Sequence, residues 1–383
     1  METDRKLFFK NAARAVIKVG SGVLTGSGGL NVEIVNSLSR QICELISHGL
    51  EVLLVSSGAM AAGQKKLALA ARPDEIPKRQ AVAAVGQAGL ILSYENAFAH
   101  YGRQVAQILL TSDDLSASRR RYLNARNTLH TLMAWGVLPI INENDTVVVE
   151  EIKFGDNDNL SALIALMMNA DILVNLTDID GLYTGDPRSD PEAKQISVVS
   201  DINRNIEKTA SGMPGVLGTG GMLSKIRAAR KATVAGIPMV IANGLQTDIL
   251  LKLFSGQKHG TFFTPADHKL SNRKSWIGFT LKPKGSVKID DGAVRAILEK
   301  GKSLLSGGIT DVEGDFGVGA PVHIVDGRGR RLAAGLVNYS AADIRRIKGC
   351  QSRQIAEKLG EKPYDEVIHR NNMTVLESVV SGR

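Results

Sequence analysis

Short runs of consecutive apolar residues recur between residues 14 and 241, and most of them end in small or polar residues. Continuous apolar runs of this length predict strands that are buried on both faces, as in a parallel sheet. Segments with helical periodicity lie between them, the clearest over residues 32–47. We therefore predict an α/β fold with an open, mainly parallel sheet sandwiched by helices. The predicted strands are Arg14–Val19, Glu51–Val55, Val105–Leu110, Val137–Ile141, Ile172–Leu176 and Ile237–Ile241.

The pattern changes near residue 263, where prolines, lysines and arginines replace the apolar runs. Beyond this point, short alternating segments are separated by glycine-rich turns, which is typical of a small β-barrel. The predicted strands there are 287–289, 322–325 and 333–337. We therefore predict an α/β domain over residues 1–262, a linker over 263–281, a small β-barrel domain over 282–362 and a C-terminal tail over 363–383.

The composition excludes several classes of protein. Apolar residues make up 43% of the chain and charged residues 22%, which argues against disorder. The aromatic content of 4% argues against a single-strand binder based on base stacking. Cys43 and Cys350 are too few for a disulfide framework or a zinc site, which fits a reducing compartment. No signal peptide is evident at the N-terminus and no apolar run reaches membrane length, so we expect a cytoplasmic protein.

The net charge of +8 is concentrated in the C-terminal part of the chain, where residues 263–383 carry 20 Lys and Arg against 14 Asp and Glu. Such asymmetry suggests an anionic partner, and RNA is the candidate. Few aromatic residues accompany these charges, so we favour a structural or regulatory role for this domain over RNA binding. The basic residues concerned are Arg328, Arg330, Arg331, Arg345, Arg346 and Lys348.

Polar clusters follow the strand that ends at Ile141. Asn142–Asp145 come directly after it, and a second cluster, Gly155–Asn159, precedes a helical pattern whose N-terminus it would cap. An EF-hand loop is excluded, because its glycine at position six and glutamate at position twelve do not occur in register. Ligands bind at the carboxyl ends of parallel strands, so we interpret this stretch as one wall of a small-molecule pocket.

Two lysines beside glycines indicate a phosphate site. Lys18 interrupts an apolar strand next to Gly20, where a lysine is costly unless it meets an anion. Lys225 lies one turn into a helical pattern that follows the glycine-rich segment 215–221. The alternatives are a lysine that reaches solvent from a strand edge and an ordinary surface loop. Two lysines on separate glycine loops of one sheet favour phosphoryl transfer.

Two common nucleotide motifs are excluded. Gly301-Lys302-Ser303 resembles the end of a Walker loop, but Ala296 stands where the leading glycine belongs. No G-x-G-x-x-G follows the first predicted strand, which argues against a dinucleotide site.

Six segments occur in the order and approximate spacing of a known family. They are AVIKVGSG, LLVSSGAMAAG, PIINENDTV, FGDNDNLSAL, LTDIDGLYTGDPR and GTGGMLSK. In these segments the chain resembles the amino acid kinase family, and INEND with GDNDNLSA resembles its glutamate branch. From Lys282 on, the chain resembles the PUA domain, named for pseudouridine synthases and archaeosine transglycosylases. Gly22, Gly185 and Ser224 depart from the residues common in the family, although Ser224 keeps the hydroxyl of threonine.

The resemblance implies ATP- and Mg²⁺-dependent phosphorylation of the side-chain carboxylate of L-glutamate, the first step of proline biosynthesis. It also implies feedback inhibition by proline and a homo-oligomer. The segment Ser118–Asn127 would contribute to inhibition or subunit contacts, unless it is only a solvated basic helix. The alternatives are a kinase for acetylglutamate, aspartate, carbamate or uridine monophosphate, and an RNA-binding protein that keeps the fold as a scaffold. The first ten residues have no evident role.

The resemblance also implies roles for individual residues. Lys18 and Lys225 would contact the transferred phosphoryl group, and Asp158 would hold both lysines in place through charge-assisted hydrogen bonds. Backbone N–H groups of Gly20, Ser21 and Gly22 would bind the γ-phosphate. Ser57, Asp145 and Asn157 would bind glutamate. No side chain is assigned as a metal ligand. The implied ATP site comprises Lys18, Gly20, Ser21, Thr177, Asp178, Thr219, Gly220, Gly221, Met222, Leu223, Ser224 and Lys225.

Overall fold

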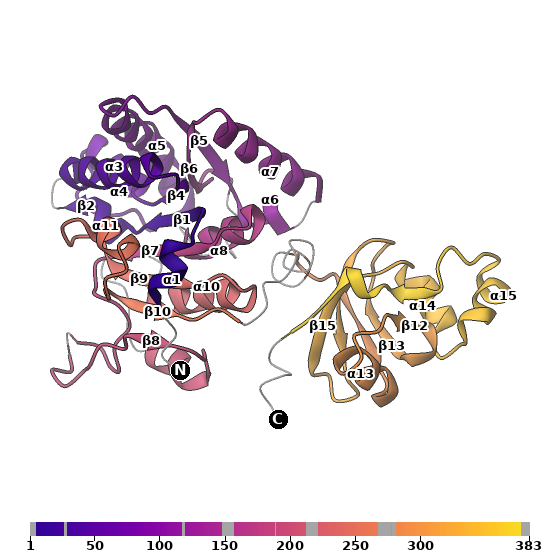
Figure 1. Cartoon of the computed structure of the whole chain (residues 1–383). Helices are drawn as coiled ribbons and strands as arrows, with labels where there is room; N and C mark the ends of the chain where they lie inside the picture. The colour runs from indigo at the N-terminus through magenta and orange to yellow at the C-terminus, as the bar shows by residue number, and fades with distance from the viewer. Residues whose placement is uncertain are drawn as a thin grey trace. The chain divides into compact units, whose positions relative to one another are not determined.

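The computed structural model describes residues 5–26, 29–116, 119–147, 157–187, 189–211, 221–266, 277 and 281–376. The chain forms two compact units, Met1–Lys269 and Leu270–Arg383 (Figure 1). No helix among these residues is long and apolar enough to cross a bilayer.

The first unit is built on an eight-stranded sheet with the order β5-β6-β4-β1-β7-β9-β10-β8. The strands from β5 to β9 in this order run parallel, whereas β10 is antiparallel to β9. Their carboxyl ends therefore meet along one edge of the sheet. The strands are β1 (Arg14–Val19), β4 (Glu51–Ser56), β5 (Val105–Leu110), β6 (Leu138–Glu143), β7 (Ile172–Thr177), β8 (Val198–Val199), β9 (Met239–Asn243) and β10 (Thr261–Phe263), and a hairpin adds β2 (Thr25–Gly26) and β3 (Gly29–Leu30).

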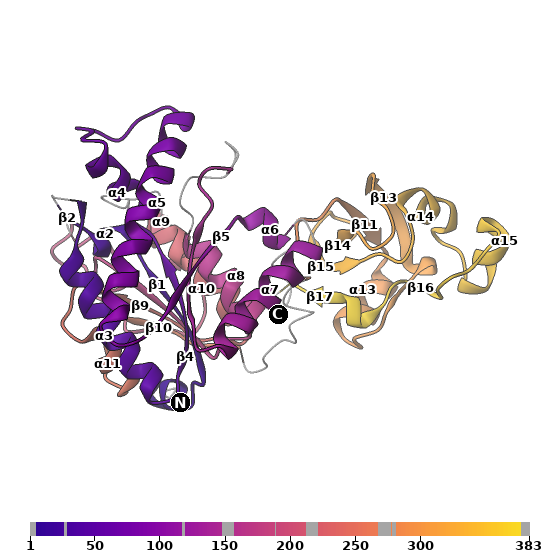
Figure 2. The same cartoon turned by 90° about the horizontal axis from the view of Figure 1, so that it is seen from above.

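Helices cover both faces of this sheet (Figure 1, Figure 2). On β1, the alternate residues Ala15, Ile17 and Val19 pack with α3, α5 and α11 on one face of the sheet. Lys18 points to the opposite face, which α8 and α10 cover. The helices are α1 (Arg5–Lys10), α2 (Ser21–Leu24), α3 (Val32–Ser47), α4 (Ala59–Lys66), α5 (Ile76–Ala99), α6 (Ser112–Ser116), α7 (Arg119–Ala134), α8 (Asn157–Met168), α9 (Arg204–Ser211), α10 (Met222–Val234) and α11 (Ile249–Phe254).

The predicted α/β fold is confirmed. Residues 14–19 and 105–110 form strands with the predicted bounds, and the other predicted strands differ by one or two residues at an end. β6 continues past Ile141 to Glu143, because Asn142 and Glu143 extend the ladder with β5. Polarity at a strand end therefore does not stop the strand.

Two glycines allow α4 and α5 to pack backbone against backbone. A Cβ on Gly86 would lie 1.8 Å from the carbonyl oxygen of Ala59, and a Cβ on Gly63 would lie 1.8 Å from that of Val82. Only glycine allows such an approach. The middle of α5 is thereby held against the first residues of α4, which follow directly on the end of β4.

The first helix, α1, is part of the core of this unit. Phe9 is 2% exposed and packs edge-on against Phe254 with ring centroids 5.2 Å apart. The buried guanidinium of Arg5 lies over the rings of Phe9 and Phe262 and donates to the carbonyl of His259. Burial lowers the pKa of Arg5 to about 10. Arg5 and Phe9, in a segment to which no role could be assigned from sequence, thus anchor α1 on the first unit.

The second unit is rich in strands, as predicted, and its main sheet has the order β13-β11-β14-β15-β17. Two strands lie beyond the predicted boundary at residue 362: β16 pairs with β12 and β17 pairs with β15, and they bury Val367, Ile368 and Met373. Its elements are β11 (Gly285–Ile289), α13 (Asp291–Leu298), β12 (Leu304–Leu305), η2 (Ser306–Gly308), β13 (Ile309–Gly314), β14 (Pro321–Val325), β15 (Arg331–Leu336), α14 (Ala341–Ile347), η3 (Ser352–Gln354), α15 (Ile355–Leu359), β16 (Glu366–Ile368), η4 (Arg370–Asn372) and β17 (Met373–Val375).

Candidate active site

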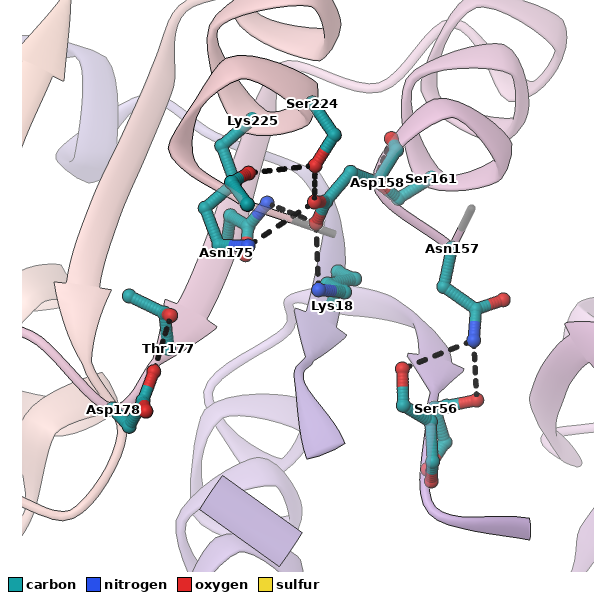
Figure 3. A network of polar contacts seen from close by, with 12 residues as sticks. Lys18, Ser56, Asn157, Asp158, Ser161, Asn175, Thr177, Asp178, Ser224 and Lys225 are labelled. Atoms are coloured by element: carbon teal, nitrogen blue, oxygen red, sulfur yellow. Dashed lines mark hydrogen bonds and ion pairs between the residues drawn. The ribbon is translucent and has the colours of Figure 1, made fainter. Parts of the chain in front are cut away.

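Asp158 lies where β1, α8 and α10 converge (Figure 3). One carboxylate oxygen is 2.6 Å from Nζ of Lys18, and the other is 3.2 Å from Nζ of Lys225. The three side chains are 2%, 5% and 7% exposed for Asp158, Lys18 and Lys225. The structure therefore brings together the three residues that were predicted to be catalytic, and it buries them.

Two neutral donors complete the environment of Asp158. Ser224 donates its hydroxyl to Oδ2 over 2.5 Å, and Asn175 donates its amide to Oδ1 over 2.8 Å. Asn175 is fully buried on β7, in register with Lys18 on β1. Each oxygen of Asp158 therefore faces one ammonium group and one neutral donor.

This arrangement keeps Asp158 ionised. Burial alone would raise the pKa of its carboxyl group, but the charges of Lys18 and Lys225, with hydrogen bonds from Lys18 and Ser224, hold that pKa well below its usual range. The charges of these three side chains sum to one positive charge within a buried cluster. Two buried ammonium groups beside each other are suited to contacting an anion such as a phosphoryl group.

Gly20 has a different role from the predicted one. Its backbone N–H donates to the carbonyl of Leu176 over 2.9 Å and so does not point to a ligand. A Cβ at Gly20 would lie 3.2 Å from the carbonyl oxygen of Leu176, a tight contact that a glycine avoids. Ser21 is the first residue of α2 and follows Gly20 at the end of β1.

Thr177 is the last residue of β7, and Asp178 follows it directly. The hydroxyl of Thr177 donates to the carboxylate of Asp178 over 3.0 Å. A Cβ on Gly22 would lie 2.8 Å from the carboxyl carbon of Asp178, so the glycine lets α2 approach this carboxylate. The predicted ATP residues of β1, α2 and β7 therefore share one edge of the sheet.

Five of the remaining predicted ATP residues, Gly221 to Lys225, lie at the start of α10. Gly221 is the N-cap of this helix, and Met222, Leu223, Ser224 and Lys225 form its first turn. Thr219 and Gly220 lie outside the described residues, as do Gly155 and Asp156.

Two of the predicted glutamate residues are in contact. Asn157, the first residue of α8, donates its amide to the hydroxyl of Ser57 over 3.0 Å, just beyond the end of β4 (Figure 3). Asn157 is 3% exposed, and its Oδ1 is buried without a hydrogen-bond partner among the described residues. An unpaired buried acceptor is costly, so this oxygen is suited to a donor supplied by a ligand.

Asp145 lies two residues beyond the end of β6 and is partly buried. Burial raises the pKa of its carboxyl group to about 6, against the opposing effect of the nearby Arg72. Burial also lowers the pKa of Arg72. The α4–α5 loop thus brings a cation towards the predicted substrate residue, a contribution that the sequence interpretation did not include.

Four residues around the predicted ones were not predicted: Asn175, Arg72, Asn142, which accepts a hydrogen bond from Asn157, and Gln87, which accepts one from Asn142. Asn175 interrupts an apolar run just as Lys18 does, so the same reasoning would have found it. Asn142 belongs to a polar cluster that was recognised, although no role was assigned to it. Gln87 and Arg72 carry no local signal, because a helix surface and a loop are where such residues usually occur.

Residues 13–243 match the family model described as the amino acid kinase family. The chain belongs to the amino acid kinase family. Residues 285–359 match the PUA domain, so this amino acid kinase carries the second domain that the resemblance implied.

Relatives align with this amino acid kinase over nearly its whole length. Glutamate 5-kinase of Syntrophotalea carbinolica is 50% identical, over 97% of this chain and 99% of the relative. Glutamate 5-kinase of Syntrophus aciditrophicus is 51% identical, over 98% of this chain and 97% of the relative. Among solved structures, UMP kinase from Bacillus anthracis is 16% identical, with a TM-score of 0.47 over 68% of this chain and 98% of its own.

Proposed function

We propose that this amino acid kinase transfers the γ-phosphoryl group of ATP to the side-chain carboxylate of L-glutamate. The products are ADP and L-glutamyl 5-phosphate, and the reaction is the first step of proline biosynthesis. The buried cluster of Lys18, Asp158 and Lys225 is the observation that carries the transfer chemistry. The choice of glutamate is supported by relatives that are glutamate 5-kinases and are half identical over nearly the whole chain.

The reaction needs no general base, because the accepting carboxylate is already ionised at neutral pH. An oxygen of this carboxylate forms a bond to the γ-phosphorus, the bond from that phosphorus to the β–γ bridging oxygen breaks, and ADP leaves with the electron pair. The requirement is to neutralise oxygens that carry negative charge throughout. Lys18 and Lys225 meet that requirement in this proposal, and Asp158 positions them.

The ATP side is assigned to the ends of β1 and β7 and to the start of α10. Thr177 and Asp178 would contact the nucleotide there, with the N-terminal turn of α10 against its phosphates. No group of three His, Cys, Asp or Glu side chains that could hold a metal occurs in the described part of the chain. Mg²⁺ would be supplied together with ATP and would neutralise part of the charge on its phosphates.

The amino acid side is assigned to Ser57, Asn157 and Asp145. The unpaired Oδ1 of Asn157 is an acceptor for the α-ammonium group of glutamate. Asp145 supplies a carboxylate for the same group, and Arg72 supplies a cation nearby that suits the α-carboxylate. Asn157, which donates to Ser57, lies on the side of Asp158 away from Thr177; Figure 3 shows the positions of Asn157, Asp158 and Thr177.

The function is tested by offering different acceptors to the purified protein with ATP and Mg²⁺ and trapping acyl phosphates with hydroxylamine. The panel comprises L-glutamate, aspartate and N-acetylglutamate, together with uridine monophosphate, whose product hydroxylamine does not trap and which is followed through the release of ADP. Hydroxamate should form with glutamate, and Lys225→Ala should abolish it while glutamate binding remains. Product with another acceptor in place of glutamate would refute the assignment.

We propose further that proline inhibits this activity at the glutamate site. Proline carries the same α-carboxylate and an ammonium group, so Asn157 and Asp145 can receive it in the same way. Titration with proline should raise the KM for glutamate without changing the KM for ATP. Inhibition that glutamate cannot overcome would place proline elsewhere.

The assembly and the second domain also belong to this proposal. A homo-oligomer, which the family resemblance implies, is part of this proposal. For the PUA domain we propose a structural or regulatory role over RNA binding, because several of its basic side chains bind groups of their own unit. Arg330 pairs with Asp326, Lys348 pairs with Asp311, Arg345 donates to the carbonyl of Gly314, and Arg346 donates to that of Lys358.

A further inference from the structure

Gln87 on α5 lies beside the amino acid side of the site. It follows Gly86, whose lack of a side chain lets α5 touch the backbone of Ala59 at the start of α4. The amide oxygen of Gln87 accepts a hydrogen bond of 2.8 Å from Nδ2 of Asn142, a residue of β6. Close helix packing thus brings a residue from the middle of a 24-residue helix to the carboxyl end of the sheet.

Asn142 connects Gln87 to a residue of the proposed substrate site. Its Oδ1 accepts from Nδ2 of Asn157 over 3.0 Å. Asn142 and Asn157 are each 3% exposed, so water has little access to either amide. Gln87, Asn142 and Asn157 therefore form a continuous chain of amide side chains, which we call the amide relay.

The orientation of each amide in the relay is fixed by the backbone. The N–H of Glu143 donates to Oδ1 of Asn142 over 2.9 Å, and Nδ2 of Asn157 donates to the carbonyl of Ser56 over 3.3 Å (Figure 3). A backbone N–H can only donate and a backbone carbonyl can only accept, so neither amide can be turned round without losing its partner. The NH₂ group of Asn142 must then point to Gln87, and Gln87 must accept this hydrogen bond with its amide oxygen.

The same constraint determines which atom of Asn157 is left for a ligand. Its NH₂ group is engaged by Ser56, Ser57 and Asn142, and its Oδ1 is the buried atom without a partner among the described residues. An oxygen held in this way can only accept. The donor that an amino acid substrate offers is its α-ammonium group.

We propose that Gln87 is a positioning residue for the amino acid substrate. By accepting from Asn142, Gln87 holds the amide relay in the one orientation that leaves Oδ1 of Asn157 free for the α-ammonium group. This inference rests on the proposed function, because it takes Asn157 to bind glutamate. Without an acceptor at position 87, the buried NH₂ of Asn142 would lose its partner, and the relay would lose its fixed orientation.

Loss of the hydrogen bond between Gln87 and Asn142 should weaken the binding of the amino acid substrate and leave the binding of ATP unchanged. The ATP side is assigned to β1, β7 and α10, which contribute no residue to the relay. Loss of one relay hydrogen bond should weaken glutamate binding about tenfold, as expected for a buried hydrogen bond. The turnover number at saturating glutamate should change much less.

The experiment compares two substitutions at position 87 in the full-length protein. Gln87→Met removes the acceptor at nearly the same side-chain length, whereas Gln87→Glu keeps an acceptor oxygen and removes the NH₂ donor. Calorimetric titration with L-glutamate in the absence of ATP gives the Kd, and steady-state rates give KM for both substrates. Gln107→Met on the edge strand β5 makes the same chemical change at an exposed position and serves as the control.

We expect Gln87→Met to raise the Kd and KM for glutamate about tenfold with an unchanged KM for ATP. Gln87→Glu should stay close to the unsubstituted protein, and Gln107→Met should be indistinguishable from it. In an Asn142→Ala background, Gln87→Met should have no further effect, because its partner is already gone.

Three results would overturn the inference. Unchanged glutamate affinity in Gln87→Met would remove Gln87 from the site. Weaker binding in Gln87→Glu than in Gln87→Met would mean that the NH₂ of Gln87 touches the substrate directly. Failure of the unsubstituted protein to bind glutamate would remove the ligand that the relay is proposed to position. By contrast, glutamate binding without hydroxamate formation would refute only the proposed reaction, and the titrations would still test the relay.

Discussion

Replacing Asp158 with asparagine removes the carboxylate that faces both buried lysines. The amide is nearly isosteric and can keep one acceptor, but it carries no charge. With an effective dielectric constant of 20, the attraction is about 6 kcal/mol for the 2.6 Å pair with Lys18 and about 5 kcal/mol for the 3.2 Å pair with Lys225. The cost of removing three charged groups from water offsets much of this attraction.

The net loss of stability is therefore smaller than the attraction. Removing one partner of a buried ion pair typically costs about 3–5 kcal/mol, because the other partner is left buried and uncompensated. For a unit of this size that corresponds to a decrease in Tm of roughly 10 °C. The turnover number should fall at least about 100-fold, because the lysines lose their fixed position.

Calorimetric melting at pH 7 and the hydroxamate assay measure the two effects. Asp248→Asn is the matched control, since Asp248 pairs with Arg40 at 39% and 40% side-chain exposure and such pairs contribute about 0–1 kcal/mol. A non-hydrolysable ATP analogue should narrow the difference in Tm between Asp158→Asn and the unsubstituted protein, because its phosphate oxygens replace the missing negative charge. A Tm and a turnover number both unchanged in Asp158→Asn would refute the role given to this residue.

Further predictions concern the substrate, the packing of α4 on α5, and the first helix. Burial raises the pKa of Asp145 to about 6, so its carboxylate takes up a proton as the pH falls through this value and loses its attraction for an ammonium group. The KM for glutamate should therefore rise below that pH, whereas the KM for ATP should not. Asp145→Asn should remove this pH dependence. Gly86→Ala should lower the free energy of unfolding by about 1–3 kcal/mol in urea titrations, because its Cβ would lie 1.8 Å from a backbone oxygen. In Gly89→Ala on the same helix, the new Cβ meets nothing within 4 Å, so the free energy of unfolding should rise by about 1 kcal/mol. Equal changes in the free energy of unfolding for Gly86→Ala and Gly89→Ala would contradict the packing of α4 on α5 described above. Phe9→Ala should cost about 3–5 kcal/mol, whereas Leu7→Ala, at a position 52% exposed, should cost less than about 0.5 kcal/mol.

The parallel sheet could be predicted because its central strands are apolar on both faces, as Arg14–Val19 shows. The edge of the sheet could not be predicted. β8 is two residues long and β10 is three, too short for a periodic signal, and β10 meets the start of the predicted linker at Phe263. In the second unit, β16 and β17 are also only three residues each, and both fall within the predicted tail.

Part of the candidate site could be predicted for a related reason. A lysine inside an apolar strand is costly unless it meets an anion, which indicated Lys18, whereas the role of Asp158 was implied by the family resemblance and not by the local pattern. No such local signal in the sequence indicates the amide relay. Gln87 and Asn142 are 55 residues apart, and their contact depends on the close approach that Gly86 allows to α5. A contact made by helix packing has no counterpart in local sequence periodicity.

The central claim is that a carboxylate oxygen of glutamate attacks the γ-phosphorus of ATP. It is tested most directly with L-glutamate that carries ¹⁸O in both oxygens of the side-chain carboxylate. Hydroxylamine attacks the acyl carbon of the product, so the released phosphate keeps the oxygen that formed the new bond. We predict one ¹⁸O atom in each phosphate released together with hydroxamate. Phosphate without ¹⁸O would show that the phosphoryl group went to water or to another acceptor, and would contradict the account.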